Sequence, residues 1–439
     1  MKLKIYPVNK PLKGAVRIPG DKSISHRSII ISSISNGVIK IYNILESDDV
    51  KKTIQVFKSC GVNIKKDGNK MIVYGKGLHS LKNSKKKLYL GNSGTSARLI
   101  MGILSFQNFS YTLLGDKSLS SRPMGRIINP LKKMGAKIKS KNNRLPVKIF
   151  GKQSLIPIKY TLPIPSAQVK SGILLAGLSV SGRTVIKEKI PSRDHTEIML
   201  KKFGAKINII KKNKTKLISL RGGFELIPKN ITVPGDFSSA AFLIVAALII
   251  KDSFLKLKNI NINPMRTGLL KALRLMGGKI RVKNMRIISG EKIADIEVKY
   301  SKLNGCKLHS KNAPLMIDEY PILAIAASQA DSKSKFYGLK ELTVKESNRL
   351  LEISNNLKKF GIINDIKNNN LTITPTKNTK ASIVKINSKG DHRMAMAFAP
   401  LGLKTKINIE NPMVVSKSYP LFWDHLKQIG FEVEKHINF

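Results

Sequence analysis

The stretch Ile127–Ile138, which reads IINPLKKMGAKI, contains the pattern that decides the fold. Apolar residues spaced for one helix face lead to two lysines, then to Gly135, and then to a short β-prone run. Glycine just after a helix can adopt the left-handed conformation that ends it, and lysine there suits the helix dipole. The stretch therefore predicts a helix that ends before Gly135 and a strand that follows it.

This pattern occurs six times along the chain. The other copies lie in Thr53–Ile64, Ile198–Ile207, Leu269–Ile280, Leu357–Gly361 and Leu426–Gly430. Their glycines are roughly 70 to 85 residues apart, a spacing too long for a solenoid repeat but sufficient for a small α/β unit. The sequence therefore predicts an α/β protein of six similar units.

A second similarity divides these units into two halves. The turn Ile18–Ser23 resembles Val233–Ser238, and an apolar helix follows each. Lys22 corresponds to Phe237, so only the first copy carries a cation. For the second copy, helix capping by Asp236 is the favoured interpretation.

The charge of the chain is extreme, at a formal +52, while its 42% hydrophobic residues are ordinary for a globular protein. Lysines are scattered along the whole chain, and only 6% of the residues are aromatic, few for base stacking. There is no zinc-finger spacing, aromatic RNA-binding motif or continuous basic helix. We interpret the charge as a compositional bias. A nucleic-acid-binding protein stays the alternative of a different class, favoured by net charge alone.

Three features predict a cytoplasmic protein without a membrane segment. The apolar run Ala240–Ile250 is too short to span a bilayer and predicts a buried helix. Cys60 and Cys306 lack metal-ligand spacing and are interpreted as core thiols of a reducing compartment. The first residues contain no apolar run typical of a signal peptide.

Five segments combine a turn with a cation near a helix start, where the helix dipole makes a cation unfavourable unless an anion binds there too. They are Gly20–Arg27, Gly91–Arg98, Ser120–Arg126, Lys345–Arg349 and Gly390–Arg393. Together they predict a site for one or two ligands with several negative charges. No Walker A motif, HExxH zinc motif or nucleophile elbow points to another enzyme class.

In the N-terminal half, the spacing of Ser23 and Arg27 places both on one helix face, suited to phosphate or carboxylate; a serine cap with solvated cations is the alternative. Gly94 would let backbone amides approach a ligand closely, and Arg98 belongs either to this site or to a structural ion pair. Ser166 and Gln168 are uncharged donors at the start of another helix.

The remaining candidates each have a structural alternative. Ser192 and Arg193 precede a helix and contribute to the same ligand, unless Asp194 or Thr196 forms a capping box there. Asp318 is either a helix cap or a base kept ionised by nearby cations. Residues 345, 346 and 349 are predicted to share one helical face, with a structural ion pair as the alternative for Glu346.

These segments, in this order, resemble the 5-enolpyruvylshikimate-3-phosphate (EPSP) synthase family over essentially the whole chain. The resemblance implies a two-lobed inside-out α/β barrel, with three βαβαββ units in each lobe and the active site in the cleft between the lobes. It implies a first lobe over residues 22–232 and a second over residues 1–21 plus 233–439.

Matched motif by motif, the resemblance implies two ligand sets. The residues around shikimate 3-phosphate would be Lys22, Ser23, Arg27, Ser166, Gln168, Ser192, Arg193, Asp318 and Lys345. The residues holding phosphoenolpyruvate would be Lys22, Gly94, Arg122, Gln168, Arg349, Arg393 and Lys417, the last in loosely similar surroundings.

The implied reaction is an addition followed by an elimination that releases phosphate. Asp318 would take the proton of the 5-hydroxyl, and Glu346, with Lys22, would deliver and later remove a methyl proton. No metal or other cofactor is expected, and the expected protein is a monomer whose partners are the two small substrates.

Two alternatives depend on single residues. Ala167 and Leu99 resemble a glyphosate-tolerant branch of the family, but that branch has alanine where this chain has Gly94, so inhibition by glyphosate is expected. The related transferase acting on UDP-N-acetylglucosamine usually carries a reactive loop cysteine in its first lobe, and neither cysteine here lies in a comparable loop.

Overall fold

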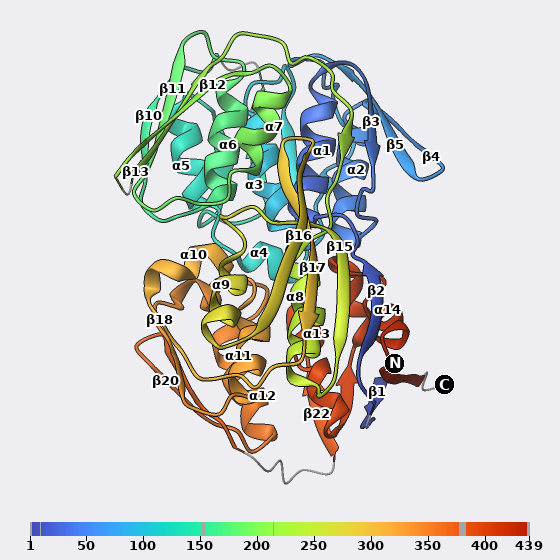
Figure 1. Ribbon diagram of the computed structural model, residues 1–439. Helices are drawn as coiled ribbons and strands as arrows, with labels where there is room; N and C mark the ends of the chain where they lie inside the picture. Colours follow the sequence, from blue (N-terminus) through green and yellow to red (C-terminus); the bar gives the residue numbers. More distant parts are fainter. Residues whose placement is uncertain (1, 9, 152–153, 214, 377–382, 437–439) are drawn as a thin grey trace. The chain divides into compact units, whose positions relative to one another are not determined.

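The computed structural model describes residues 2–8, 10–151, 154–213, 215–376 and 383–436. The chain forms two compact units (Figure 1). The N-terminal unit comprises Gly20–Val233 and the turn Ile288–Glu291. The C-terminal unit comprises Met1–Pro19, Pro234–Ile287 and Lys292–Phe439.

The N-terminal unit contains three four-stranded sheets of one topology. In sheet order their strands are β14 (Ile231–Thr232), β3 (Asn36–Tyr42), β5 (Lys70–Lys76) and β4 (Asn63–Asp67); β6 (Leu88–Tyr89), β7 (Tyr111–Leu114), β9 (Val147–Ile149) and β8 (Ile138–Ser140); and β10 (Lys159–Leu162), β11 (Arg183–Glu188), β13 (Thr215–Arg221) and β12 (Lys206–Lys212). In each sheet the first pair is parallel and the next pairs are antiparallel.

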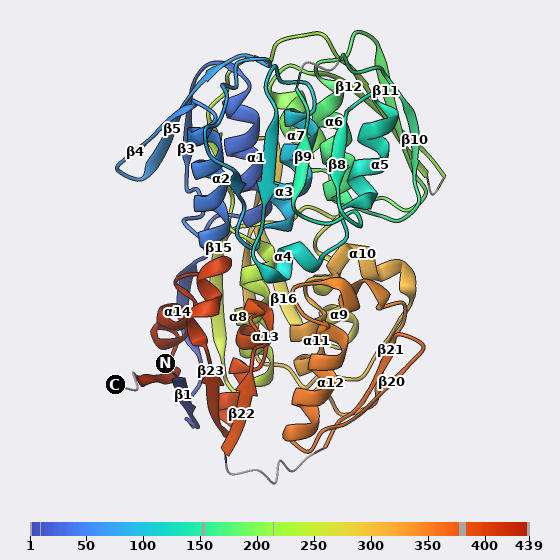
Figure 2. The same cartoon turned by 180° about the vertical axis from the view of Figure 1, so that it is seen from behind.

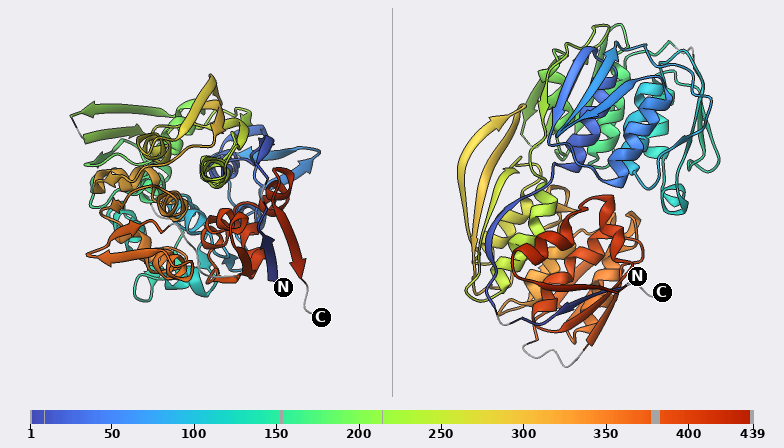
Figure 3. Two further views of the ribbon diagram at one scale, coloured as in Figure 1. Left: turned by 60° about the horizontal axis from the view of Figure 1, so that its bottom comes forward. Right: turned by 90° about the vertical axis from the view of Figure 1, so that its right-hand side faces the viewer.

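The C-terminal unit repeats this topology three times. Its sheets are β2 (Lys13–Arg17), β15 (Phe254–Asn261), β17 (Glu291–Lys299) and β16 (Lys279–Ile288); β18 (Lys307–Leu308), β19 (Ser334–Phe336), β21 (Asn370–Thr374) and β20 (Ile363–Lys367); and β22 (Ile383–Asn387), β23 (Lys406–Glu410), β1 (Lys2–Tyr6) and β24 (Glu432–His436). The right-hand view of Figure 3 shows the long β16–β17 hairpin in yellow. The first strand β1 pairs antiparallel with the last, β24.

Helices lie inside the sheets of each unit (Figure 2). Those of the N-terminal unit are α1 (Lys22–Ser33), α2 (Asp48–Ser59), α3 (Gly94–Leu104), α4 (Lys117–Ser121), α5 (Gly125–Lys133), α6 (Ala167–Gly177) and α7 (His195–Lys202). Those of the C-terminal unit are α8 (Phe237–Ile249), α9 (Gly268–Leu275), η1 (Ser310–Asn312), α10 (Ala313–Met316), α11 (Tyr320–Ser328), η2 (Lys340–Val344), α12 (Arg349–Lys359), α13 (His392–Ala397), η3 (Ala399–Leu403), η4 (Pro412–Lys417) and α14 (Phe422–Gln428).

Each unit has its own hydrophobic core built on its central helices. Every residue of α8 is buried, which confirms the buried helix predicted from Ala240–Ile250. In the other core, α3 and α6 approach so closely at Gly102 that only glycine fits there. A Cβ at this position would lie 2.1 Å from the Gly172 carbonyl oxygen. Within the described residues, no helix combines the length and apolarity needed to cross a membrane.

The predicted six-fold pattern is confirmed. The glycines that follow α2, α5, α7, α9, α12 and α14 all have positive φ, between 72° and 114°, namely Gly61, Gly135, Gly204, Gly277, Gly361 and Gly430. A strand follows each of them (β4, β8, β12, β16, β20 and β24). Only glycine adopts this backbone conformation without strain, so the sequence pattern marks real helix ends.

Candidate functional site

The first cationic segment opens α1 in the N-terminal unit. The carboxylate of Asp21 caps the helix by accepting from the Ile24 N–H at 2.9 Å. Lys22 and Ser23 therefore lie in the first turn, where backbone N–H groups are unpaired. The Lys22 Nζ forms an ion pair with Asp49 of α2, a partner that the sequence did not predict.

Arg27 is buried one turn further along α1. Its guanidinium donates to Thr196 Oγ1 at 2.7 Å, to Ser171 Oγ at 3.0 Å and to the Ser23 carbonyl at 2.9 Å. The last bond confirms that residues 23 and 27 share a face. Burial lowers the pKa of Arg27 to about 10, which leaves it charged near neutral pH.

The second segment opens α3 and brings two arginines together. A Cβ added at Gly94 would lie 2.9 Å from Arg98 NH1 and 3.3 Å from Arg122 NH1. Arg122 follows α4 in extended conformation and donates to Asn92 Oδ1 at 2.6 Å and to Ser118 Oγ at 3.1 Å. The small residue at position 94 thus gives two guanidinium groups access to one helix N-terminus.

Gln168 is linked to the same cluster. Its Oε1 accepts from Arg98 NH1 at 2.8 Å, and its Nε2 donates to Thr95 Oγ1 at 2.9 Å. Ser166 is the N-cap of α6 and accepts from the Val169 N–H at 3.4 Å. Arg98, for which the sequence left two roles open, therefore orients Gln168.

The capping box considered for the Ser192–Glu197 segment does not form. Asp194 is the N-cap residue of α7 but makes no side-chain cap bond, and the carboxylate of Glu197 contacts two buried lysines instead. Buried charges dominate here because leaving a lysine unpaired in the core costs more than losing a cap. Arg193 is half-buried just before the helix.

In the C-terminal unit, one predicted arrangement is wrong. Lys345 and Glu346 do not share a helical face with Arg349, because α12 begins only at Arg349. The Asn348 side chain caps the start of α12 by accepting from the Leu351 N–H, as a good N-cap residue does. Asp318 precedes α11 and is not its cap, since Glu319 occupies that position.

Arg349 nevertheless collects three carboxylates around its buried guanidinium. It donates to Glu346 Oε2 at 2.6 Å, to Asp391 Oδ2 at 2.8 Å and to Asp318 Oδ1 at 3.2 Å. Burial alone would lower the pKa of Arg349, but these negative charges outweigh it and raise the pKa above its usual value. Lys345 Nζ lies 3.8 Å from Asp318 Oδ1.

Two further cations of the predicted site donate to the backbone beside residues of this cluster. Arg393, in the first turn of α13, donates to the Asp318 carbonyl at 3.0 Å. Lys417, in η4, donates to the Gly390 carbonyl at 2.9 Å, next to Asp391. Lys345, Arg349 and Arg393 therefore contact Asp318, Glu346 is linked to it through Arg349, and Lys417 contacts the residue before Asp391.

The sequence missed the residues that orient these cations. Asp49, Asn92 and Asp391 each hold one of the predicted basic side chains. Asn92 and Asp391 lay inside quoted motifs, but neither was predicted to hold an arginine; the N-cap bond from the Arg393 N–H to Asp391 at 2.9 Å gives Asp391 a local role as well. The cation that each of the three holds is distant in sequence, so no local pattern predicts these contacts.

The two cysteines are buried, as predicted. Burial raises the pKa of Cys60 to about 12 and that of Cys306 to about 11, so neither is a reactive thiolate near neutral pH. Among the described residues, no group of three or more His, Cys, Asp or Glu could hold a metal ion.

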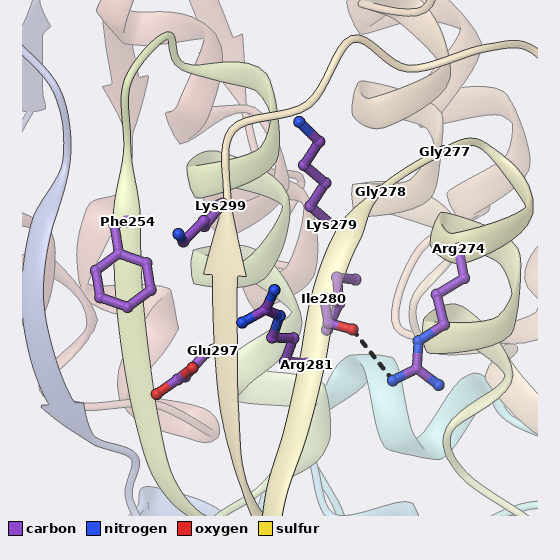
Figure 4. Close-up of a pocket in the computed structure, with 9 residues that line it drawn as sticks. All are labelled: Phe254, Arg274, Gly277, Gly278, Lys279, Ile280, Arg281, Glu297 and Lys299. Atoms are coloured by element: carbon purple, nitrogen blue, oxygen red, sulfur yellow. Dashed lines mark hydrogen bonds between the residues drawn. The ribbon is translucent and has the colours of Figure 1, made fainter.

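A pocket of about 450 Å³ lies elsewhere in the C-terminal unit (Figure 4). It is lined by Phe254, Arg274, Gly277, Gly278, Lys279, Ile280, Arg281, Glu297 and Lys299. None of the predicted site residues is among them. At least one of its basic residues has a structural role, because Arg274 donates to the Ile280 carbonyl at 3.2 Å, beyond the end of α9.

A buried histidine in α1 makes folding stability depend on pH. His26 contacts Thr53 Oγ1 at 2.8 Å, and burial, aided by the charges of Lys22 and Arg27, lowers its pKa well below the usual 6.5. As the pH falls, His26 therefore binds a proton in the unfolded chain at a higher pH than it does in the folded protein. The contribution of His26 to stability is complete above pH 6.5 and declines as the pH falls, by up to about 1.4 kcal/mol per pH unit.

We expect a His26→Gln variant to lose less stability than the parent protein between pH 7 and pH 5. Urea unfolding at several pH values measures both slopes. His79→Gln is the matched control, because His79 is exposed in the same unit. Equal slopes for the parent and the His26 variant would contradict the prediction.

Comparisons with known proteins agree on one family. The family model described as EPSP synthase (3-phosphoshikimate 1-carboxyvinyltransferase) matches residues 7–426. The 3-phosphoshikimate 1-carboxyvinyltransferase of Ruthia magnifica subsp. Calyptogena magnifica is 46% identical over 434 residues, covering 98% of each chain. That of Zymomonas mobilis is 43% identical over 432 residues, covering 97% of this chain and 95% of the relative.

Solved structures agree with this family. An EPSP synthase from Acinetobacter baumannii superposes with a TM-score of 0.86 at 42% identity, covering 99% of this chain and 100% of the other. The enolpyruvyl transferase NikO from Streptomyces tendae has a TM-score of 0.78 over 99% and 98% of the two chains. At 17% identity, NikO supports the fold alone.

Proposed function

Because the chain belongs to the EPSP synthase family, we propose that the two groups of cations described above bind the two substrates of that reaction. The chain is a transferase of the shikimate pathway. It transfers the enolpyruvyl group of phosphoenolpyruvate to the 5-hydroxyl of shikimate 3-phosphate and releases phosphate, a step toward chorismate and the aromatic amino acids.

The proposed contacts follow the charges of the substrates. Shikimate 3-phosphate is held by the cations and hydroxyls at the starts of α1 and α6 and by the Ser192–Arg193 loop, together with Asp318 and Lys345. The carboxylate and phosphate of phosphoenolpyruvate are held by Lys22, Gly94, Arg122, Gln168, Arg349, Arg393 and Lys417. Guanidinium groups suit both anions because their paired donors match two oxygens at once.

The observation that carries the proposed chemistry is the pair of carboxylates on Arg349. Asp318 and Glu346 approach different nitrogens of this guanidinium, at 3.2 Å and 2.6 Å. We assign Asp318 as the base for the 5-hydroxyl proton. Glu346, together with Lys22, moves the methyl proton of the intermediate. Charge that develops on the phosphate is stabilised by the arginines, which need no reorganisation to do so.

We further propose that residues 22–232 act as one lobe and that residues 1–21 plus 233–439 act as the other. We also propose that the protein is a monomer and that it acts in the cytoplasm on its two small anionic substrates. Size-exclusion chromatography with light scattering measures the oligomeric state directly.

The test of the function is phosphate release from phosphoenolpyruvate with and without shikimate 3-phosphate. Release is expected only when both are present. Release that requires UDP-N-acetylglucosamine instead would assign the chain to the related transferase.

A methyl group at position 94 is expected to weaken phosphoenolpyruvate binding. The Gly94→Ala Cβ would lie 2.9 Å from Arg98 NH1, so the guanidinium must shift away from the helix start. We expect KM for phosphoenolpyruvate to rise by about tenfold, the loss of roughly one charge-assisted hydrogen bond. KM for shikimate 3-phosphate serves as the internal comparison and should rise less, because Arg98 reaches that substrate only through Gln168.

Glyphosate inhibition is measured with the same pair of proteins. The parent protein is expected to be inhibited in competition with phosphoenolpyruvate, and Gly94→Ala to be inhibited less. Full activity of the parent protein in excess glyphosate at limiting phosphoenolpyruvate would refute the expectation.

A further inference from the structure

Four buried charges lie beneath the Ser192–Arg193 loop and are not used by the proposed chemistry. They belong to α6, β11, α7 and β13 and are Lys170, Glu188, Glu197 and Lys216, here called the Lys170 cluster. The exposed fraction of each side chain is 3% or less. The two positive and two negative charges cancel, so the cluster is neutral as a whole.

Lys170 is fully paired within this cluster. Its Nζ lies 2.8 Å from Glu197 Oε1, 3.1 Å from Glu188 Oε2 and 3.3 Å from the Ser192 carbonyl oxygen. An ammonium group has three donors, and each has an acceptor here. Burial alone would lower the pKa of Lys216, but Glu197 and Asp194 raise it, so Lys216 stays charged.

Glu188 links the Lys170 cluster to the Ser192–Arg193 loop. Its second oxygen, Oε1, accepts from the Ser192 N–H at 3.3 Å and also from the Ser192 hydroxyl. A serine hydroxyl has one proton to donate, and here Glu188 receives it. Ser192 is itself buried, with 5% of its surface exposed, whereas the next residue, Arg193, is half-buried.

We propose that Glu188 is a positioning residue for shikimate 3-phosphate and that Ser192 acts through Glu188 rather than by donating to the substrate. Glu188, which is held by Lys170, accepts from both the backbone N–H and the hydroxyl of Ser192. These bonds fix Ser192 and thereby aim Arg193 at the phosphate. This inference rests on the proposed site, in which Arg193 binds shikimate 3-phosphate.

Stability alone is a poor reason for such a cluster. Buried ion pairs usually contribute little beyond what well-packed apolar residues would supply, because desolvation offsets their attraction. The helices that the cluster joins also carry Ser171 and Thr196, which accept from Arg27 at 3.0 Å and 2.7 Å. The cluster thus connects the supports of Arg27 and Arg193, two residues proposed to bind shikimate 3-phosphate.

The test is a double-mutant cycle with Glu188→Gln and Ser192→Ala, read in KM for shikimate 3-phosphate and in kcat. Each single variant is expected to raise this KM by about tenfold, the loss of one hydrogen bond to a charged group, and to leave kcat and KM for phosphoenolpyruvate within about twofold. The double variant should be no worse than the worse single variant, because both changes remove the same bond.

Two outcomes would overturn the proposal. Effects that multiply in the double variant mean that Ser192 contacts the substrate independently of Glu188. An unchanged KM in Glu188→Gln means that the carboxylate positions nothing. Thermal unfolding identifies loss of fold, and Ser192→Ala, which removes no charge, still tests the link if Glu188→Gln is unstable.

Two further variants separate this proposal from its premise. Glu197→Gln removes an equal buried charge whose Oε1 contacts Lys170 and Lys216, so it should lower stability without a tenfold rise in KM. Arg193→Ala should raise KM for shikimate 3-phosphate. If it does not, the site assignment fails, whatever the cycle shows.

Discussion

Replacing Asp318 with asparagine is expected to lower kcat by a factor of about 10² to 10⁴, the usual contribution of a positioned general base. The variant keeps the shape of the side chain and an oxygen that can accept from Arg349 NH1, now at 3.2 Å. It loses the ability to take a proton from the 5-hydroxyl. KM for each substrate should therefore change only a few-fold.

Steady-state phosphate release measures this effect, and the matched control is Asp331→Asn. Asp331 is exposed in the same unit, so its variant should keep the parent kcat. A different result would redefine the role of Asp318. If Asp318→Asn keeps kcat and raises only KM for shikimate 3-phosphate, the carboxylate binds substrate and some other group is the base.

The repeated unit was predictable because its determinants are local. A glycine such as Gly135 ends its helix through its own backbone conformation, with φ of 98°, and the lysines before it act over one turn. Neither effect depends on the rest of the fold. The same holds for Asp236, whose cap bond to the Ser238 N–H at 2.7 Å spans two residues.

The start of α12 was predicted wrongly, and the capping box left open at α7 does not form. Spacing alone placed Glu346 on a helix, but Asn348 offers a strong N-cap just beyond it. The residue order allowed a box with Glu197, but that carboxylate pairs with Lys170, which lies 27 residues earlier in the chain. A local N-cap decides the first case and a tertiary partner the second, and residue spacing alone reveals neither.

The candidate site was predictable by residue type but not by arrangement. The cations stood out as unfavourable at helix starts, so their positions could be read from the sequence. The residues that hold these cations in place could not be read from the sequence. Arg349 has the clearest example, since its partner Asp391 lies 42 residues away and is fully buried.

Removing the Arg349 side chain is expected to reduce both stability and activity. An Arg349→Ala variant leaves Asp391 buried without its guanidinium partner, with Glu346 and Asp318 close by. Breaking a buried ion pair in this way costs about 3 to 5 kcal/mol of unfolding free energy. Loss of one arginine from the proposed phosphoenolpyruvate site should also lower kcat/KM for this substrate by about a hundredfold or more.

Urea unfolding and steady-state kinetics separate the two effects when three variants are compared. Arg349→Lys restores a positive charge near Asp391 but not the fork of donors, so it should recover much of the stability and little of the affinity for phosphoenolpyruvate. Arg274→Ala, an exposed arginine of the same unit, should change neither. If Arg349→Ala is destabilised yet keeps the parent kcat/KM for phosphoenolpyruvate, Arg349 serves the fold alone, and the anion must be bound by Arg122, Arg393 and Lys417 without it.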